Sequence, residues 1–185
     1  MWEIGSGKAK ISAVLTIDIN PAVVPDILHD LDSFPWSVAD SSFDAIIMFS
    51  VIERLGYPVK VIEECHRIFK PHGKIYMLTP HFSGAGSFID PTHKWHFSAR
   101  PFGYFISGTP LQQENGFYSP VRFKLVRRLV SLKGLVDKLP FVQKLVNKYL
   151  AFWEGYLCFF MRGAGIYIEL EKNEFCCRTI VDVAG

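Results

Sequence analysis

Cysteine is scarce in this sequence, and a long uncharged apolar run is missing. The 185 residues hold four cysteines, and neither the neighbours Cys176 and Cys177 nor the other two have the spacing of a disulfide framework or a zinc site. We therefore expect reduced thiols and a cytoplasmic protein without a bound metal. No stretch reaches the roughly 18 uncharged apolar residues that a membrane-spanning helix needs. We expect no signal peptide at the N-terminus.

Charge is also limited, with 21% of residues charged against 49% apolar, and a net charge of only +2. This balance is that of an ordinary globular protein and excludes disorder, collagen and coiled coil. At about 150 residues per domain, the length predicts a single domain over residues 1–185. The 16 phenylalanines indicate a large core or an apolar pocket.

The positive charge is concentrated in one stretch. Residues 122–148 hold eight basic side chains and a single acidic one, Asp137. Such a segment indicates a lid or packing helix, or a contact with an anionic membrane surface or an acidic partner. Nucleic acid is the least favoured partner because it usually needs a broader basic surface with a stacking platform. The sequence does not indicate an oligomeric state.

Near-continuous apolar runs predict four strands of a parallel sheet covered on both faces. They lie at residues 2–4, 14–19, 43–49 and 75–78. Between the last two, residues 58–70 repeat apolar side chains at helical spacing, and Pro71-His72-Gly73 ends the helix. Strand, helix and strand in this order make a right-handed crossover, so the predicted class is α/β.

The second half of the chain has a different pattern. Residues 80–120 are rich in Gly, Pro, His and aromatics without a sustained period, which is typical of a functional loop region. Leucine and valine spacing predicts two helical pieces over residues 123–161, broken near 139–140. Residues 166–170 alternate and predict a late strand.

A glycine-rich turn follows the first predicted strand. In Glu3-Ile4-Gly5-Ser6-Gly7 the glycines allow a ligand to approach the backbone closely, and Asp18 at the end of the next strand is placed to accept hydrogen bonds from ribose hydroxyls. A nicotinamide dinucleotide fold is disfavoured. The third glycine of its fingerprint would fall at Lys10, and Asp18 comes too soon after the turn.

Six short motifs in order carry a family resemblance: EIGSG, TIDIN, HDLDSFPW, DSSFD, IERL and RIFKPHG. Over residues 2 to about 82 the chain resembles class I S-adenosylmethionine-dependent methyltransferases of the type 11 kind. It departs from the family pattern at Arg54, where a histidine is usual, and at His72, where a glycine is usual. The segment between Gly7 and the second strand is also short.

The resemblance implies a Rossmann-like, doubly wound, mostly parallel sheet with helices on both faces, plus a helical and loop substrate cap. Residues 1–80 would form the cofactor-binding half, about 80–160 the cap, and 161–185 a late strand and tail. S-adenosyl-L-methionine would be the cofactor. The residues implied to hold it are Glu3, Gly5, Ser6, Gly7, Asp18, Ile19, Asn20, Asp30, Leu31, Ser50 and Val51.

Methyl transfer from a sulfonium needs alignment and exclusion of water, and an alcohol, phenol or amine acceptor also needs a base. The candidates in and beside the loop region are His81, Asp90, His93 and Tyr104, together with His96. His93 and His96 could instead cap or pack a helix start. The nearby aromatic residues could wall a substrate pocket or form a core beneath the loop.

The sequence therefore predicts a methyltransferase acting on a small-molecule or lipid-like acceptor. The alternative is a non-catalytic S-adenosylmethionine-binding scaffold or partner subunit with the same fold. Peripheral attachment to a membrane through residues 122–148 is compatible with either.

Overall fold

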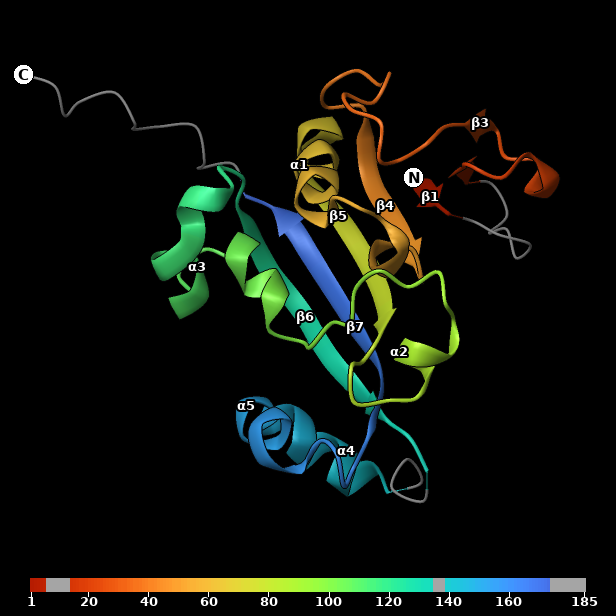
Figure 1. Ribbon diagram of the computed structural model, residues 1–185. Coiled ribbons are helices and arrows are strands. Elements are labelled where there is room, and N and C mark those ends of the chain that lie inside the picture. The colour runs from red at the N-terminus through yellow and green to blue at the C-terminus, as the bar shows by residue number, and fades with distance from the viewer. Residues whose placement is uncertain (6–13, 135–138, 174–185) are drawn as a thin grey trace, which may run out of the picture.

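The computed structural model describes residues 1–5, 14–134 and 139–173, and its centre is one seven-stranded sheet with the strand order β3-β2-β1-β4-β5-β7-β6 (Figure 1). The strands are β1 (Trp2–Ile4), β2 (Leu15–Asp18), β3 (Ile27–Leu28), β4 (Phe43–Phe49), β5 (Phe69–Pro80), β6 (Phe123–Leu132) and β7 (Gly163–Lys172). The four strands expected from apolar runs and the late strand are all present.

Helices and short helical turns join the strands. The helices are α1 (Pro58–Ile68), α2 (Gly86–Ile89), α3 (Pro110–Asn115), α4 (Pro140–Lys148) and α5 (Leu150–Phe152). The 3-10 turns are η1 (Pro21–Val23), η2 (Ile52–Arg54), η3 (Pro101–Phe105) and η4 (Gly116–Tyr118), and the π-helical turn is η6 (Trp153–Leu157).

The sheet is mostly parallel, as expected. Strands β1 to β5 pair in parallel, and only the two pairs that involve β7 are antiparallel. The chain runs outward from β1 to β3 on one side and resumes at β4 on the other side of β1. The strand order therefore reverses between β1 and β4, and in open α/β sheets ligands bind at the carboxyl end of that point.

The two faces of the sheet differ in their cover. On one face, Met48, Met77 and Ile168 lie side by side in register and are buried on the side of α1. On the other, Phe49 and Leu78 are paired neighbours at the carboxyl end and both are exposed. We expected helices on both faces of the sheet. Within the described residues they cover the α1 face, where η3 and α3 lie beside α1 (Figure 1).

One expectation is wrong. Residues 123–132 form strand β6, not a helix, and pair antiparallel with β7. The register shifts between Leu125 and Arg127 and again between Ser131 and Leu132, so β6 is irregular at both places. These irregularities break the period of two that would have marked a strand. The leucines of this segment are spaced by three or four residues, which is the spacing of one face of a helix. The second helical piece, after residue 139, is confirmed as α4 and α5.

The C-terminal end of α1 ties down the connection from β3 to β4. Arg67 donates to the carboxylates of Glu64 and Asp40 at 2.7 and 2.6 Å and to the carbonyl oxygens of Trp36 and Val38. Glu64 in turn accepts from the backbone N–H of Trp36 at 2.9 Å. This network gives the motif residues Glu64 and Arg67 a structural task.

Candidate functional site

The carboxyl ends of β1, β2 and β4 meet at Gly5. Its N–H donates to the carbonyl of Ile17 at 2.8 Å, and its φ of +64° lies in the left-handed region. A Cβ on Gly5 would lie 2.4 Å from Cγ2 of Val51, so no other residue fits there without displacing the Val51 side chain, which follows β4. The predicted residues Ser6 and Gly7 lie outside the described residues.

Asp18, Ile19 and Asn20 form a turn at the end of β2. The Asp18 carboxylate accepts from the N–H of Asn20 at 2.9 Å, and the Asn20 side chain accepts from Ala22 at 3.0 Å, where it caps η1. Asp18 is half-buried, whereas Ile19 and Asn20 are exposed. The turn therefore holds an acidic side chain at the edge of the sheet, one strand away from Gly5.

The loop after β3 separates the two residues predicted to hold an adenine. Asp30 is exposed and accepts from the N–H of Asp32 at 2.9 Å, but the Leu31 side chain is buried in the core. Asp32, which the sequence did not single out, accepts from the backbone N–H of Gly56 at 2.7 and 2.9 Å and of Tyr57 at 3.3 Å. It thereby fastens this loop to the start of α1.

The remaining predicted cofactor residues lie on β1 and after β4. Glu3 is buried on the sheet face away from α1, in register with Ile47. Ser50 is exposed and has a φ of +54°, which turns the chain sharply at the end of β4. Its carbonyl accepts from Nε of Arg54 at 3.1 Å, and Val51 beside it is buried against Gly5.

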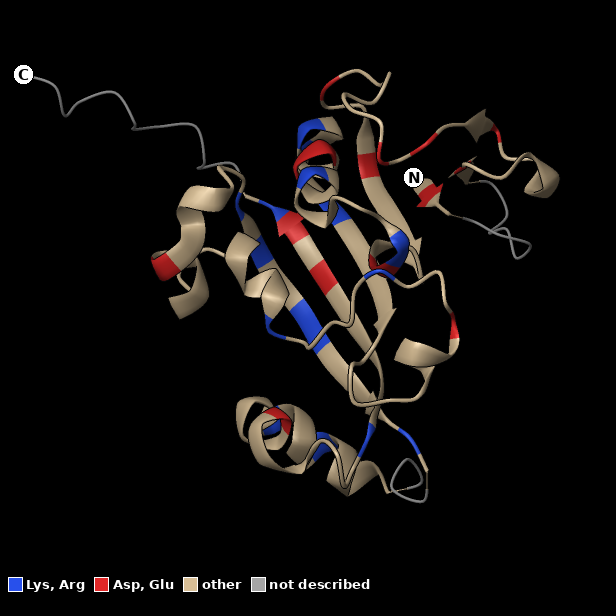
Figure 2. Cartoon of the chain, in the orientation of Figure 1, with Lys and Arg blue, Asp and Glu red and all other residues tan. Residues whose placement is uncertain are grey.

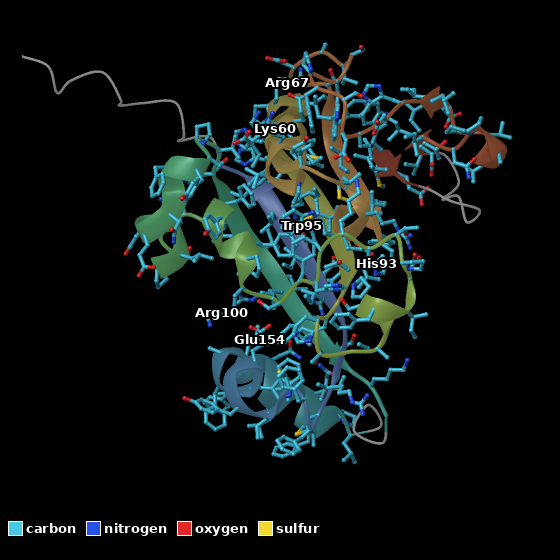
Figure 3. The ribbon with its side chains drawn as sticks, viewed as in Figure 1. Lys60, Arg67, His93, Trp95, Arg100 and Glu154 are labelled. Carbon is cyan, nitrogen blue, oxygen red and sulfur yellow. The ribbon has the colours of Figure 1, made fainter. Side chains whose placement is uncertain are left out.

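A buried carboxylate and imidazole face each other just beyond β4. Glu53 is fully buried, and one of its oxygens accepts from the Thr79 hydroxyl at 3.0 Å. The other oxygen, Oε1, lies 3.8 Å from Nε2 of His93, and no hydrogen bond reaches either atom within the described residues. Burial raises the pKa of the Glu53 carboxyl. Figure 3 shows His93 beside the carboxyl ends of β4 and β5.

Asp90 is held as an ion. It forms a salt bridge with Arg54 at 2.7 Å and accepts from the hydroxyl and N–H of Thr92. The hydrogen bonds from Thr92, together with that from Arg54, lower the pKa of the Asp90 carboxyl. A carboxylate stabilised in this way is a weak base, so the structure favours a positioning task for Asp90.

The structure places His81 in the core and not at an open site. Its ring is fully buried, with Nδ1 2.9 Å from the hydroxyl of Ser83 and Nε2 3.2 Å from Oε1 of Glu154. The same Glu154 oxygen accepts from the backbone N–H of Ala99 at 2.7 Å. Glu154 comes from η6, so the pair joins β5 to the last helical run (Figure 3).

A pocket of about 620 Å³ opens on the α1 face. One of its lining side chains is Ile52, the residue after Val51. Tyr104, the fourth predicted catalytic residue, lines it. So does His96, whose Nδ1 lies 2.9 Å from the Ser87 hydroxyl while its ring stacks on Phe88 at 4.1 Å. The other lining side chains include Pro58, Val59, Ile62, Trp95, Phe97, Phe102, Phe105 and Tyr118. The predicted aromatic pocket thus exists, and several of the same residues are also core.

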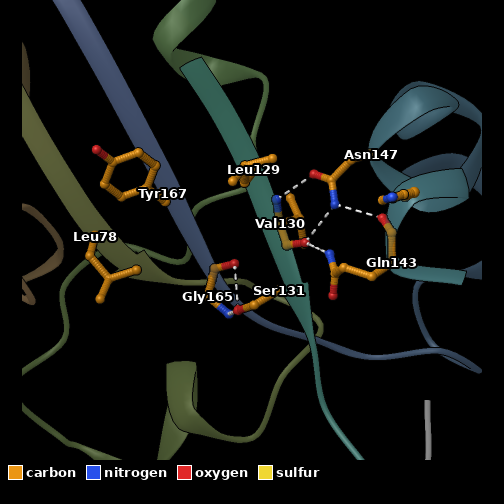
Figure 4. A pocket seen from close by; sticks show the side chains of 9 residues that line it. Leu78, Leu129, Val130, Ser131, Gln143, Asn147, Gly165 and Tyr167 are labelled. Atoms are coloured by element: carbon orange, nitrogen blue, oxygen red, sulfur yellow. Dashed lines mark hydrogen bonds between the residues drawn. The ribbon is translucent and has the colours of Figure 1, made fainter. Parts of the chain in front are cut away.

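A second hollow of about 550 Å³ lies on the opposite side, between the uncovered sheet face and α4 (Figure 4). Leu78, Leu129 and Tyr167 form its apolar floor, with Gln143 and Asn147 of α4 along one side. The described residues contain no group of three or more side chains suited to hold a metal ion. No helix in the described ranges is long and apolar enough to cross a membrane.

Comparison with known proteins identifies the fold. Residues 3–77 match the family model of a methyltransferase domain, and no curated protein matches the sequence. A SAM-dependent methyltransferase from Archaeoglobus fulgidus superposes with a TM-score of 0.64 at 16% identity, covering 92% of this chain and 85% of that one. A putative methyltransferase from Bacillus halodurans gives 0.60 at 12% identity, covering 92% and 91%.

A third similar structure belongs to the complex between the Haloferax volcanii Trm112 methyltransferase activator and a putative methyltransferase. Its TM-score is 0.56 at 14% identity, covering 92% of this chain and 80% of that one. The chain therefore has the fold of S-adenosylmethionine-dependent methyltransferases, and the class I resemblance is confirmed. S-adenosyl-L-methionine is the cofactor that the matched domain and these structures imply.

Proposed function

We propose that this chain transfers a methyl group from S-adenosylmethionine to a small-molecule or lipid-like acceptor with an apolar part. The observation that carries the proposal is the convergence of Gly5, Asp18 and Val51 at the carboxyl ends of β1, β2 and β4, where the strand order reverses. The residues present fit the cofactor. The Gly5 turn has the backbone conformation of a close ligand approach, and Asp18 stands beside it.

Asp18 would accept the ribose hydroxyls, Asp30 the adenine amino group, and the turn at Ser50 and Val51 would pass beneath the methionine part. Glu3, Ile19, Asn20 and Leu31 keep the supporting tasks that the resemblance implies, although Leu31 supports from within the core. When bound, S-adenosylmethionine supplies a methyl group on a cationic sulfur, and the acceptor takes it in an in-line displacement that leaves a neutral thioether.

The aromatic pocket lined in part by Ile52 is the proposed acceptor site. Its walls present aromatic and aliphatic side chains to the apolar part of an acceptor, and His96 and Tyr104 are polar groups among them. We assign the base to His96 because Ser87 and Phe88 fix its ring and its Nε2 remains available to take the acceptor's proton. His93 and Glu53 lie behind this wall as a positioning pair.

A second candidate function is a scaffold or partner subunit that binds the cofactor without catalysis. The exposed Phe49 and Leu78 on the uncovered sheet face favour it, since such a face can receive another protein. The likeness to a structure of an activator complex supports the same reading. We further propose a single domain in the cytoplasm, supported by the free, buried thiols of Cys65 and Cys158.

Calorimetric titration of the whole chain with S-adenosylmethionine, S-adenosylhomocysteine and a nicotinamide dinucleotide tests the cofactor assignment. We expect binding of the two adenosyl compounds only. Asp18→Ala should weaken that binding by roughly tenfold or more, because the ribose loses a hydrogen bond to a charged group. Glu114→Ala, at an exposed carboxylate on α3, is the control. Equal affinities of the Asp18 variant and the parent protein would contradict the placement.

Catalysis is tested by S-adenosylhomocysteine release with a panel of apolar alcohols, phenols and amines. His96→Ala should lower turnover by roughly 100-fold or more, the range for loss of a general base, and leave cofactor affinity unchanged. His72→Ala, at an exposed histidine on β5, should change neither quantity. Cofactor binding without turnover of any acceptor would favour the scaffold. Full turnover in the His96 variant would refute its assignment as the base.

A further inference from the structure

Large apolar side chains are exposed in a row along the helical run that precedes β7. The first five recur every three or four residues along α4, α5 and η6, and two phenylalanines follow in the turn after η6. We call this row the aromatic face, and it consists of Phe141, Leu145, Tyr149, Phe152, Tyr156, Phe159 and Phe160. Phe141, Phe159 and Phe160 are 75%, 72% and 87% exposed, which is unusual for phenylalanine.

The other side of the same run is anchored in the protein. Val146, Leu150 and Trp153 are buried in the core, and the indole N–H of Trp153 donates to the carbonyl of Met161 at 3.1 Å. Glu154 points inward to His81 and Ala99. The aromatic face is therefore held outward by a fixed support.

The charges around the aromatic face are of one sign. Lys144 and Lys148 lie on α4. Lys133 and Arg162 come just before and just after the run in sequence, and the Lys133 N–H donates to the Arg162 carbonyl at 3.0 Å; all four side chains are exposed. Nζ of Lys148 stands 5.3 Å from the ring of Tyr149. Among the described residues from 123 to 162, Glu154 is the one acidic side chain, and it is buried. Figure 2 shows the contrast with the acidic and basic mixture around α1 and β7.

We propose that the aromatic face docks on an anionic lipid surface, with the helical run lying in the plane of the membrane interface. A row of phenylalanine and tyrosine rimmed by lysine and arginine suits the boundary between acyl chains and negatively charged headgroups. The run from residue 140 to 157 contains Lys144, Lys148 and Glu154, so it lacks the roughly 20 predominantly apolar residues of a membrane span and suits a position on the bilayer surface.

A second copy of the chain fits this face less well. In a two-fold pair the same patch meets itself, so the lysines on α4 of one copy would face basic side chains of the other, and the described residues of the patch offer no exposed acidic side chain to pair with them. An anionic membrane neutralises the same charges. Lys124 and Arg127 are also exposed, but they lie on strand β6 and not on the helical run that carries the aromatic face.

The test is co-sedimentation of the whole chain with phosphatidylcholine vesicles, with and without phosphatidylserine. We expect binding to the phosphatidylserine vesicles that weakens as salt is raised. Replacing both Lys144 and Lys148 by glutamine should lower the affinity by about thirtyfold, since each cation near an anionic surface contributes roughly a fivefold increase. The matched control removes the same charge elsewhere, at Lys60 and Lys124, and should change the affinity little.

The apolar contribution is tested by Phe159→Ser together with Phe160→Ser, which should abolish sedimentation, against the control Phe117→Ser on η4, a residue that is 77% exposed. Circular dichroism should show all variants folded, because these side chains have few contacts to lose. In Phe159→Trp, the tryptophan emission should shift to shorter wavelength on addition of phosphatidylserine vesicles.

Absence of vesicle binding by the parent protein would overturn the proposal. So would an equal loss in the Phe117 control. A change from dimer to monomer in the Phe159 and Phe160 variant, measured by light scattering without vesicles, would assign the face to a second copy instead. None of these measurements uses methyl transfer, so they stand or fall apart from the proposed reaction.

Discussion

Glu53 and His93 place two proton acceptors opposite each other in a buried position. Nδ1 of His93 lies 3.1 Å from the carbonyl of Ser87, which only accepts, so Nδ1 carries a proton. In a neutral ring Nε2 is then an acceptor, and it faces Oε1 of Glu53 at 3.8 Å. Two acceptors without a donor between them are unfavourable in a buried site. A proton on the Glu53 carboxyl resolves this, in keeping with the pKa that burial raises.

Replacement of Glu53 by glutamine tests this interpretation. Burial raises the pKa of Glu53 in the folded chain above its ordinary value of 4.5, so the folded state holds the proton more tightly than the unfolded state. The parent protein should then lose stability as the pH rises from 4.5 through the raised pKa. Glu53→Gln has no carboxyl to ionise and keeps an acceptor for Thr79. Its melting temperature relative to the parent should increase over that interval.

The measurement is thermal unfolding of both proteins from about pH 4 to about pH 8. Glu63→Gln on α1 is the control, and its difference from the parent should not follow the same curve. A constant difference between the Glu53 variant and the parent would mean that the carboxyl ionises alike in the folded and unfolded chains.

At the scale of single residues, the sequence predicted the positions of residues whose placement depends on the neighbouring backbone. It did not predict the partners of residues that contact distant segments. Gly5 and Asp18 follow directly from a turn and a strand end. Asp32 and Glu154 act on backbone groups 24 and 55 residues away, at Gly56 and Ala99, and nothing beside them in the sequence indicates those partners. His81 was singled out for its place after a strand, and burial by η6 decides its task.

At the scale of elements, α4 protects the open edge of the sheet. β6 is the outermost strand, and the outward backbone groups of Val130 are taken by Asn147, whose Oδ1 accepts from the N–H at 2.7 Å and whose Nδ2 donates to the carbonyl at 2.9 Å. Gln143, one helical turn earlier, donates to the same carbonyl and accepts from Leu132 at 3.0 Å. Two amide side chains thus replace a neighbouring strand (Figure 4).

Asn147→Ala should expose this edge. The loss of bonds to Val130 should destabilise the chain by about 1–2 kcal/mol, and the Val130 amide should exchange its hydrogen faster. Denaturant unfolding and hydrogen exchange measure the two effects. Lys144→Ala, on the same helix, is the matched control and should change neither. An unaltered exchange rate at Val130 would show that α4 does not cap the strand.

The parallel strands were predictable because buried strands are continuous apolar runs, and α1 because its apolar period is regular. β6 was not predictable, because its leucines repeat every three or four residues, as in a helix. The register shifts in its pairing with β7 allow this spacing in a strand. An edge strand with one wet face also carries Lys124 and Arg127, which read as the polar side of a helix. Pairing with β7, some 40 residues later, decided the outcome.

At the scale of the whole molecule, the two faces of the sheet differ in what they carry. The α1 face carries the core and the aromatic pocket, and the edge between β1 and β4 carries residues predicted to bind the cofactor. The opposite face, with Phe49, Leu78 and Tyr167, has little cover among the described residues. Composition could not reveal this asymmetry, because a half-exposed leucine or tyrosine looks the same in the sequence as a buried one.

The position of β7 in the sheet has a consequence for biosynthesis. β7 lies between β5 and β6, although it is the last of the three to leave the ribosome. Until residue 172 has emerged, β5 and β6 have no partner on the sides that β7 will fill. The nascent chain therefore exposes two unpaired strand edges until β7 emerges, and completion of the sheet waits on long-range pairing, which is slow. A chain truncated after Arg162 would keep both edges exposed and should aggregate.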